Sequence, residues 1–128
     1  MSSVDRCYNV EDFRRRTRRR LPKGLFEYVD LGTEDGVAMR ENRASFDRIR
    51  LQTRFLVDLG ELDFTARLLG RSQRLPIGIA PAGIAGLLQH EGEVALARAA
   101  RDHGVPYVLA NTSITSMERV AEVGGDLW

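Results

Sequence analysis

The chain has 128 residues, 43% of them hydrophobic and 29% charged, a composition typical of a single soluble globular domain. Its net charge of +1 gives no overall reason to expect nucleic acid as a partner, and its one cysteine, Cys7, excludes an internal disulfide framework. Because the sequence has no run of about 18 apolar residues and no secretory signal pattern, we expect a cytoplasmic protein without a transmembrane helix.

The first part of the sequence predicts three helices. Asn9 is typical of a helix N-cap, and Val10, Phe13, Thr17 and Leu21 follow it at helical spacing. Pro22 suits the first turn of a second helix, which we expect Gly32 to end. Thr33 and the two acidic residues after it predict the cap and first turn of a third helix.

An arginine run lies within the first predicted helix. Six of the seven residues from Arg14 to Arg20 are arginine. Such a run is most often a solvated helix face. The alternative is a peripheral contact with anionic lipid or another acidic surface.

The pattern changes at Leu51 to short, partly alternating segments. Arg54–Asp58 and Phe64–Leu68 predict extended structure, with Gly60 and Gly70 at the turns. We therefore divide the chain into a first segment, residues 1–74, and a second segment, residues 75–128.

The second segment alternates strands with helices. The predicted strands are Leu75–Ala80, Val105–Ala110 and the start of a third at Asp126–Trp128, and the predicted helices are Glu91–His103 and one that ends at Gly124–Gly125. Gly104 is typical of the residue that follows a helix, and Val94, Ala95 and Ala99 predict a helix face that packs closely on a sheet. Thr115 and Glu118 match a capping box for the last helix.

This β-α-β-α-β order predicts right-handed crossovers and a parallel sheet. The repeat suits either a doubly wound sheet or a (β/α)₈ barrel, and neither is complete in 128 residues. Because the chain stops inside a predicted strand, we expect it to be a piece of a longer protein.

Two loops follow the predicted strands, at the edge where α/β proteins place their sites. Pro81-Ala82-Gly83 has little side chain to obstruct a flat ring, and its backbone groups can meet a polar ligand edge. A tight turn that merely needs small residues explains the same pattern and is the commoner case. Asn111, Thr112 and Ser113 form the second loop, either as ligand contacts or as helix caps.

Other candidate residues carry weaker signals. His90 and His103 have no carboxylate or cysteine partner at a ligand spacing, so we predict no metal site. The sequence contains no G-x-G-x-x-G and no G-x-x-x-x-G-K motif, which argues against a dinucleotide site and a P-loop. Tyr28 lies in an apolar helix, where a core tyrosine is the commoner interpretation.

Several motifs, taken in order, resemble those of the FMN-dependent 2-hydroxy acid oxidising enzymes. They are Asn9-Val10-Glu11-Asp12-Phe13, Arg20-Leu21-Pro22-Lys23, Phe26-Glu27-Tyr28-Val29, Glu41-Asn42-Arg43 with Phe46, Leu75-Pro76-Ile77-Gly78-Ile79-Ala80-Pro81, Glu91-Gly92-Glu93 and Ala97-Arg98-Ala99-Ala100. The likeness covers nearly the whole chain. Within the family, the opening motif, Gly83 and the final Gly-Asp-Leu-Trp are most similar to the (S)-mandelate dehydrogenases.

The resemblance implies a TIM barrel preceded by helices and a small hairpin, with FMN bound at the barrel mouth. It implies that Tyr28 binds the substrate carboxylate and that Pro81, Ala82 and Gly83 run beside the flavin. Ala110 stands where the family usually has a serine that hydrogen-bonds the flavin, so Asn111 or a backbone group is expected to replace that contact.

The resemblance also places the family's catalytic histidine, substrate-binding arginines and phosphate loops beyond residue 128. We therefore expect no catalytic residue in this chain and no turnover by the chain alone. For the complete protein the resemblance implies a small 2-hydroxy acid substrate, a tetramer, and oxygen, a quinone or a cytochrome as electron acceptor. The alternative is a non-catalytic piece that acts by associating with a complementing chain through its exposed sheet edges.

Overall fold

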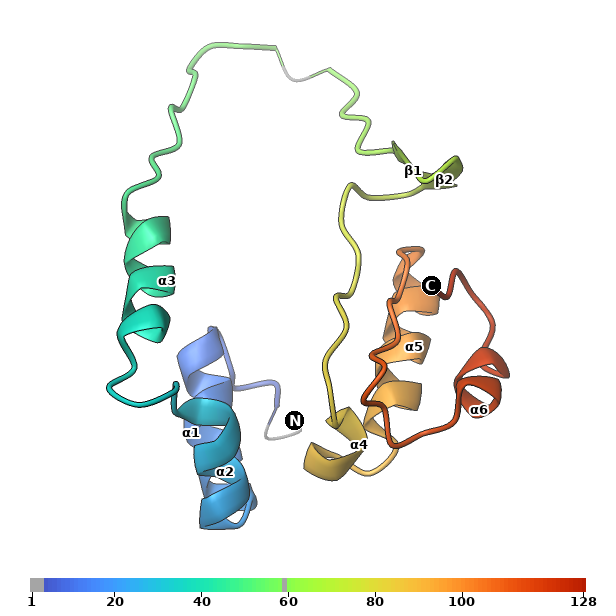
Figure 1. Ribbon diagram of the computed structural model, residues 1–128. Coiled ribbons are helices and arrows are strands. Elements are labelled where there is room, and N and C mark those ends of the chain that lie inside the picture. The colour runs from blue at the N-terminus through green and yellow to red at the C-terminus, as the bar shows by residue number, and fades with distance from the viewer. Residues whose placement is uncertain (1–3, 59) are drawn as a thin grey trace. The chain divides into compact units, whose positions relative to one another are not determined.

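The computed structural model describes residues 4–58 and 60–128, and its internal contacts divide the chain after Val57. The first unit contains helices α1 (Val10–Arg20), α2 (Lys23–Asp30) and α3 (Val37–Asp47). The second, from Asp58 to Trp128, contains strands β1 (Ala66–Leu68) and β2 (Arg71–Gln73) and helices α4 (Ala85–Leu88), α5 (Gly92–His103) and α6 (Met117–Ala121) (Figure 1).

Helix α1 begins where the sequence predicts. The side chain of Asn9 accepts a hydrogen bond from the backbone N–H of Asp12 at 2.9 Å, which confirms the predicted cap. The guanidinium of Arg14 donates to both carboxylate oxygens of Asp30, at 2.5 and 2.9 Å, and so joins α1 to α2. Phe26 is the one large apolar side chain that is buried among the described residues of this unit.

The starts of α2 and α3 differ from the predictions. Pro22 is the N-cap of α2 rather than its first helical residue, and its carbonyl accepts the first helical bond, from Phe26. Helix α3 begins after Gly36, which has the left-handed φ of +65°, and not after Thr33. The segment from Thr33 instead forms a turn that the N–H of Gly36 closes on the Thr33 carbonyl, so the acidic residues precede the helix.

The hairpin lies later than the first predicted extended segment. Residues 54–58 form no strand, so that part of the prediction is wrong. Residues 66–68 pair antiparallel with residues 71–73 around Leu69 and Gly70, which both have positive φ. Two consecutive residues with positive φ match the right-handed twist of the paired strands, so they favour this tight two-residue turn.

Three segments of the second unit run parallel, as the β-α-β-α-β prediction requires. Ile79 pairs with Tyr107, and Tyr107 pairs with Leu127. The ladder includes bonds from the Ile79 N–H to the Pro106 carbonyl at 2.8 Å and from the Leu109 N–H to the Trp128 carbonyl at 2.9 Å. The carboxyl ends of the first two segments therefore lie at one edge, followed by the loops at 81–83 and 111–113.

The core of this unit lies between helices α5 and α6 and the parallel segments. Its buried members are Ala97, Ala100, Val105, Tyr107 and Val120. Small alanine side chains let α5 approach the sheet closely. The predicted packing face was partly wrong, because Val94 is buried whereas Ala95 and Ala99 are exposed. Gly104 ends α5 in the left-handed conformation, as predicted.

The cap of α6 is one residue later than the capping box predicts. Ser116 is the N-cap, and its hydroxyl accepts from the backbone N–H of Arg119 at 3.3 Å. Thr115 does not cap the helix, because its hydroxyl donates to the carboxylate of Glu93 at 2.9 Å. The predicted box of Thr115 and Glu118 is therefore wrong, and its threonine is used in a tertiary contact.

Candidate functional site

The two loops that follow the parallel segments lie side by side. The backbone N–H of Ile84 donates to the carbonyl of Thr112 at 3.3 Å, which ties the end of the first loop to the second. Within the second loop the N–H of Ser113 donates to the carbonyl of Ala110 at 3.0 Å. The strand order predicts both loops at one edge, and this contact confirms that they meet.

The first loop is an exposed surface with few atoms beyond its backbone. Pro81, Ala82 and Gly83 are all exposed to solvent. A Cβ added at Gly83 would lie 2.5 Å from the hydroxyl oxygen of Thr112, so even a methyl group there requires Thr112 to move. In the second loop, Ala110 is half-buried and Asn111 is exposed. The five residues predicted to contact cofactor thus lie on neighbouring strand ends.

A buried carboxylate lies behind both loops, and the sequence indicated it only as part of the Glu91-Gly92-Glu93 motif, without a role of its own. Glu93 has no exposed surface. Its oxygens accept from the Thr115 hydroxyl at 2.9 Å and from the Ile114 N–H at 3.4 Å. Burial alone would raise the pKa of Glu93, but the hydrogen bonds it accepts, the one from the Gly86 backbone first among them, outweigh burial and hold this pKa below its ordinary value.

The turn between the first loop and α5 is held in an unusual conformation. Ile84 and Glu91 both have positive φ, 52° and 51°, which is rare for side chains with a Cβ and rarer for a β-branched one. Such residues persist only where the surrounding contacts fix them. Here a short helix, α4, separates them, and Gly92 approaches the backbone of Ala85 too closely for a side chain.

Tyr28 belongs to the first unit, on α2, and its side chain is 71% exposed. The interpretation of Tyr28 as a core tyrosine is therefore wrong for this chain. The exposure leaves its hydroxyl accessible to a ligand. His90 and His103 are also exposed, at the turn before α5 and at the last residue of α5.

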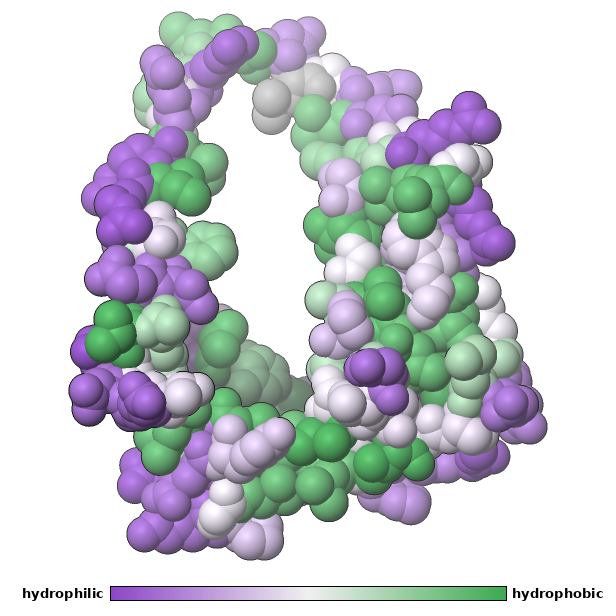
Figure 2. Space-filling view, in the orientation of Figure 1, coloured by the Kyte–Doolittle hydropathy of each residue, from purple (hydrophilic) through white to green (hydrophobic). Residues whose placement is uncertain are grey.

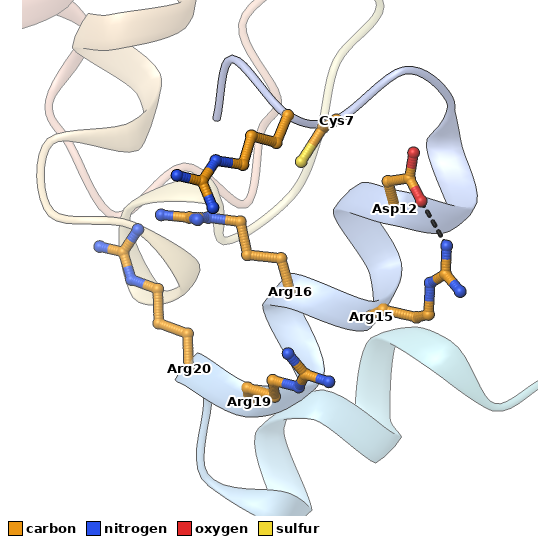
Figure 3. Close-up of a pocket in the computed structure, with 7 residues that line it drawn as sticks. Cys7, Asp12, Arg15, Arg16, Arg19 and Arg20 are labelled. Carbon is orange, nitrogen blue, oxygen red and sulfur yellow. Dashed lines mark hydrogen bonds and ion pairs between the residues drawn. The ribbon is translucent and has the colours of Figure 1, made fainter. Parts of the chain in front are cut away.

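Arginines gather along one side of α1. A groove of about 560 Å³ is lined by Arg6, Cys7, Asp12, Arg15, Arg16, Arg19 and Arg20. Figure 3 shows Arg15 turned toward Asp12, with which it forms an ion pair, while Arg16 and Arg20 extend away from that pair. Because five arginines outnumber the single aspartate, this groove carries a net positive charge.

Known proteins show what the chain is similar to. Residues 17–128 match the family described as FMN-dependent dehydrogenase. The (S)-mandelate dehydrogenase of Pseudomonas putida is 40% identical over 122 residues, covering 94% of this chain and 31% of that protein. The L-lactate dehydrogenase of Bartonella quintana is 40% identical over 118 residues, covering 91% and 31%. The chain thus spans about a third of the length of these relatives.

Solved structures give the same result. A monotopic membrane protein, (S)-mandelate dehydrogenase, superposes with a TM-score of 0.88 at 40% identity, covering 96% of this chain and 33% of that one. A mandelate oxidase mutant with a monooxide FMN adduct has a TM-score of 0.81 at 35% identity, covering 91% and 37%. These likenesses confirm the predicted fold: N-terminal helices, a small hairpin and the first part of a TIM barrel.

The strand-end loops of this chain fit the cofactor of that family. A flat ring needs an exposed backbone with small side chains, which Pro81, Ala82 and Gly83 provide. The match over residues 17–128 confirms FMN as the cofactor that the resemblance implied. The chain belongs to the FMN-dependent dehydrogenase family.

Proposed function

We propose that this chain is the N-terminal part of an enzyme that oxidises an (S)-2-hydroxy acid, such as mandelate or lactate, to the 2-oxo acid. The family match over residues 17–128 carries the proposal. The mandelate- and lactate-oxidising relatives at about 40% identity support this substrate class.

In this proposal the loops at the strand ends hold one side of the flavin. Pro81, Ala82 and Gly83 would lie beside the ring, where their backbone carbonyls and the N–H groups of Ala82 and Gly83 could meet its polar edge. Ala110 has no hydroxyl to donate, so the exposed amide of Asn111 or a backbone group takes over that contact. When bound, FMN supplies the acceptor for the hydride that leaves the α-carbon of the substrate.

Tyr28 is proposed to donate a hydrogen bond to the substrate carboxylate. Its exposed hydroxyl supports this role. Oxidation also requires a base for the substrate hydroxyl proton and cationic groups for its carboxylate. We assign neither to this chain, so the 128 residues by themselves should bind FMN weakly and show no turnover.

The test uses the complete natural protein that contains this chain. It should carry the absorbance of a flavin, and anaerobic (S)-mandelate or (S)-lactate should bleach that absorbance whereas the (R)-enantiomers should not. Replacing Tyr28 by phenylalanine should raise the KM for the hydroxy acid without loss of bound FMN. A protein without flavin, or a flavin that no 2-hydroxy acid reduces, would rule out the proposal. Reoxidation by oxygen, a quinone or a cytochrome then identifies the electron acceptor.

A peripheral contact with an anionic membrane, at its cytoplasmic face, is part of the proposal. The P. putida (S)-mandelate dehydrogenase is described as membrane-associated, and a solved (S)-mandelate dehydrogenase as a monotopic membrane protein. No helix in the described part of this chain is long and apolar enough to cross a membrane. The arginine-lined groove along α1 supports a surface contact, since each arginine near an anionic leaflet contributes about 1 kcal/mol. Sedimentation with anionic vesicles at low salt, but not with neutral vesicles or at high salt, is the expected result.

A second candidate function is association without catalysis. Large apolar side chains are exposed in both units, including Phe46, Leu51, Phe55, Ile77 and Ile114, and Figure 2 shows apolar residues at the surface. Such surfaces are typical of chains that pack against a partner or a further segment. Size-exclusion chromatography separates the cases: a monodisperse monomer of the 128-residue chain would contradict this candidate, and a tetramer is the expected state of the complete enzyme.

A further inference from the structure

Glu93 is a charged residue where charge is costly. Its side chain has no exposed surface, and an isolated carboxylate in such a place would cost several kcal/mol or become protonated. Hydrogen-bond donors compensate it instead: the Thr115 hydroxyl and the Ile114 N–H donate to its oxygens, and the backbone of Gly86 lies close to Oε2. The donors compensate the charge, so the cluster is a built feature of the fold.

The groups around Glu93 lie just after the two loops, 81–83 and 111–113, that are proposed to face the flavin. Gly86 lies three residues after Gly83, and Ile114 and Thr115 directly follow the loop that ends at Ser113. One carboxylate on α5 therefore holds both segments. The hydrogen bond from Ile84 to Thr112 is a second link between them.

The packing around the carboxylate is tight on the side of the first loop. A Cβ added at Gly86 would lie 2.6 Å from Oε2 of Glu93 and 2.8 Å from Cγ1 of Ile114. A side chain at position 86 would therefore require Glu93 or Ile114 to move. A small shift of Glu93 would be transmitted directly to Gly86 and to the loop before it.

A simpler role for Glu93 is stabilisation of the α5 dipole, because it lies in the first turn of that helix. That role does not need burial, since an exposed acidic residue in the first turn serves equally well. Glu91, two residues earlier, is only partly buried and pairs with Arg119 on the surface. The dipole accounts for an acidic residue and leaves the buried position and its loop donors unexplained.

We propose that Glu93 is a positioning residue that fixes the two strand-end loops in the arrangement that binds FMN. The inference rests on the proposed function. Two donors, one directed at each oxygen of an acceptor-only group, explain why the group is a carboxylate: an amide would turn its own N–H groups toward one of these donors. An apolar side chain would leave the donors buried and unpaired.

The test is FMN affinity in the complete natural protein, measured by titrating flavin-free protein with FMN and following the quenching of flavin fluorescence. Glu93→Gln keeps the size of the side chain and should raise the FMN Kd at least tenfold, which corresponds to about 1.4 kcal/mol. Glu91→Gln removes the same charge two residues away and should leave Kd within twofold of wild type. Circular dichroism establishes that each protein is folded at the titration temperature.

A double-mutant cycle with Thr115→Val separates positioning from general stability. The valine removes the hydroxyl that donates to Glu93 and should raise Kd about threefold or more, while the double variant should be little worse than Glu93→Gln alone, because both changes break one interaction. Visible circular dichroism of the bound flavin should change in both single variants.

The outcomes that overturn the inference are distinct. If Glu93→Gln lowers the unfolding midpoint but leaves Kd within twofold, Glu93 has a structural role only. If Glu93→Gln does not fold, Thr115→Val decides, and an unchanged Kd in that variant overturns the inference. If wild-type protein binds no FMN, the proposed function fails and takes this inference with it.

Discussion

Replacing Gly92 by alanine tests how closely α5 packs on the turn before it. In the interior of a helix this change usually stabilises a protein by roughly 0.5–1 kcal/mol. At Gly92, however, the new Cβ would lie 2.5 Å from the carbonyl carbon of Ala85 and 3.0 Å from the amide nitrogen of Gly86. The first distance is about 1 Å inside ordinary contact. Both atoms belong to the backbone and cannot rotate away, so we expect the free energy of unfolding to fall by about 3 kcal/mol, near the upper end for overpacking.

The assay is urea unfolding of the complete natural protein, followed by far-ultraviolet circular dichroism. Gly24→Ala in α2 is the matched control, because a Cβ at Gly24 would meet no atom within 4 Å. This control should leave stability unchanged or raise it by up to about 1 kcal/mol. Equal effects of the two substitutions, or a Gly92→Ala protein as stable as wild type, would refute the packing described for this turn.

Three further predictions each concern the hydrogen bonds of one side chain. Ser116→Ala should destabilise the protein by about 1 kcal/mol in urea unfolding, because it removes the observed cap of α6, whereas Glu118→Gln should have little effect. Asp126→Asn should cost about 1–2 kcal/mol in the same assay, because Asp126 accepts from Arg71 and Gln73 of β2; Asp102→Asn, at an exposed pair, should change stability by less than about 0.5 kcal/mol. Finally, the pKa of Glu93 in the folded protein lies below its ordinary value of about 4.5. At pH values near and below 4.5 the unfolded chain therefore binds more protons than the folded protein. Wild-type stability should therefore fall as the pH drops through that range, and Glu93→Gln should lose this part of the pH dependence; an identical pH profile in the two proteins would contradict the lowered pKa.

Features with local causes were predictable from the sequence. The Asn9 cap, the glycine that ends α5 and the alternation of strands and helices each depend on a few neighbouring residues. The meeting of the loops at 81–83 and 111–113 was also predictable, because parallel strands must place their carboxyl ends at one edge. Residue type and spacing were therefore enough to place the two loops at one edge, whereas their role beside a cofactor came from the family resemblance.

Tertiary contacts decided the rest. The local pattern favours Thr115 as the cap of α6, but Ser116 caps the helix because a carboxylate 22 residues before Thr115 takes the Thr115 hydroxyl. For the same reason Glu93 looked like an ordinary acidic residue in a first helical turn, since nothing near it in the sequence indicates burial. A sequence pattern specifies what a side chain can donate or accept, and only the fold brings it to the partner that uses that capacity.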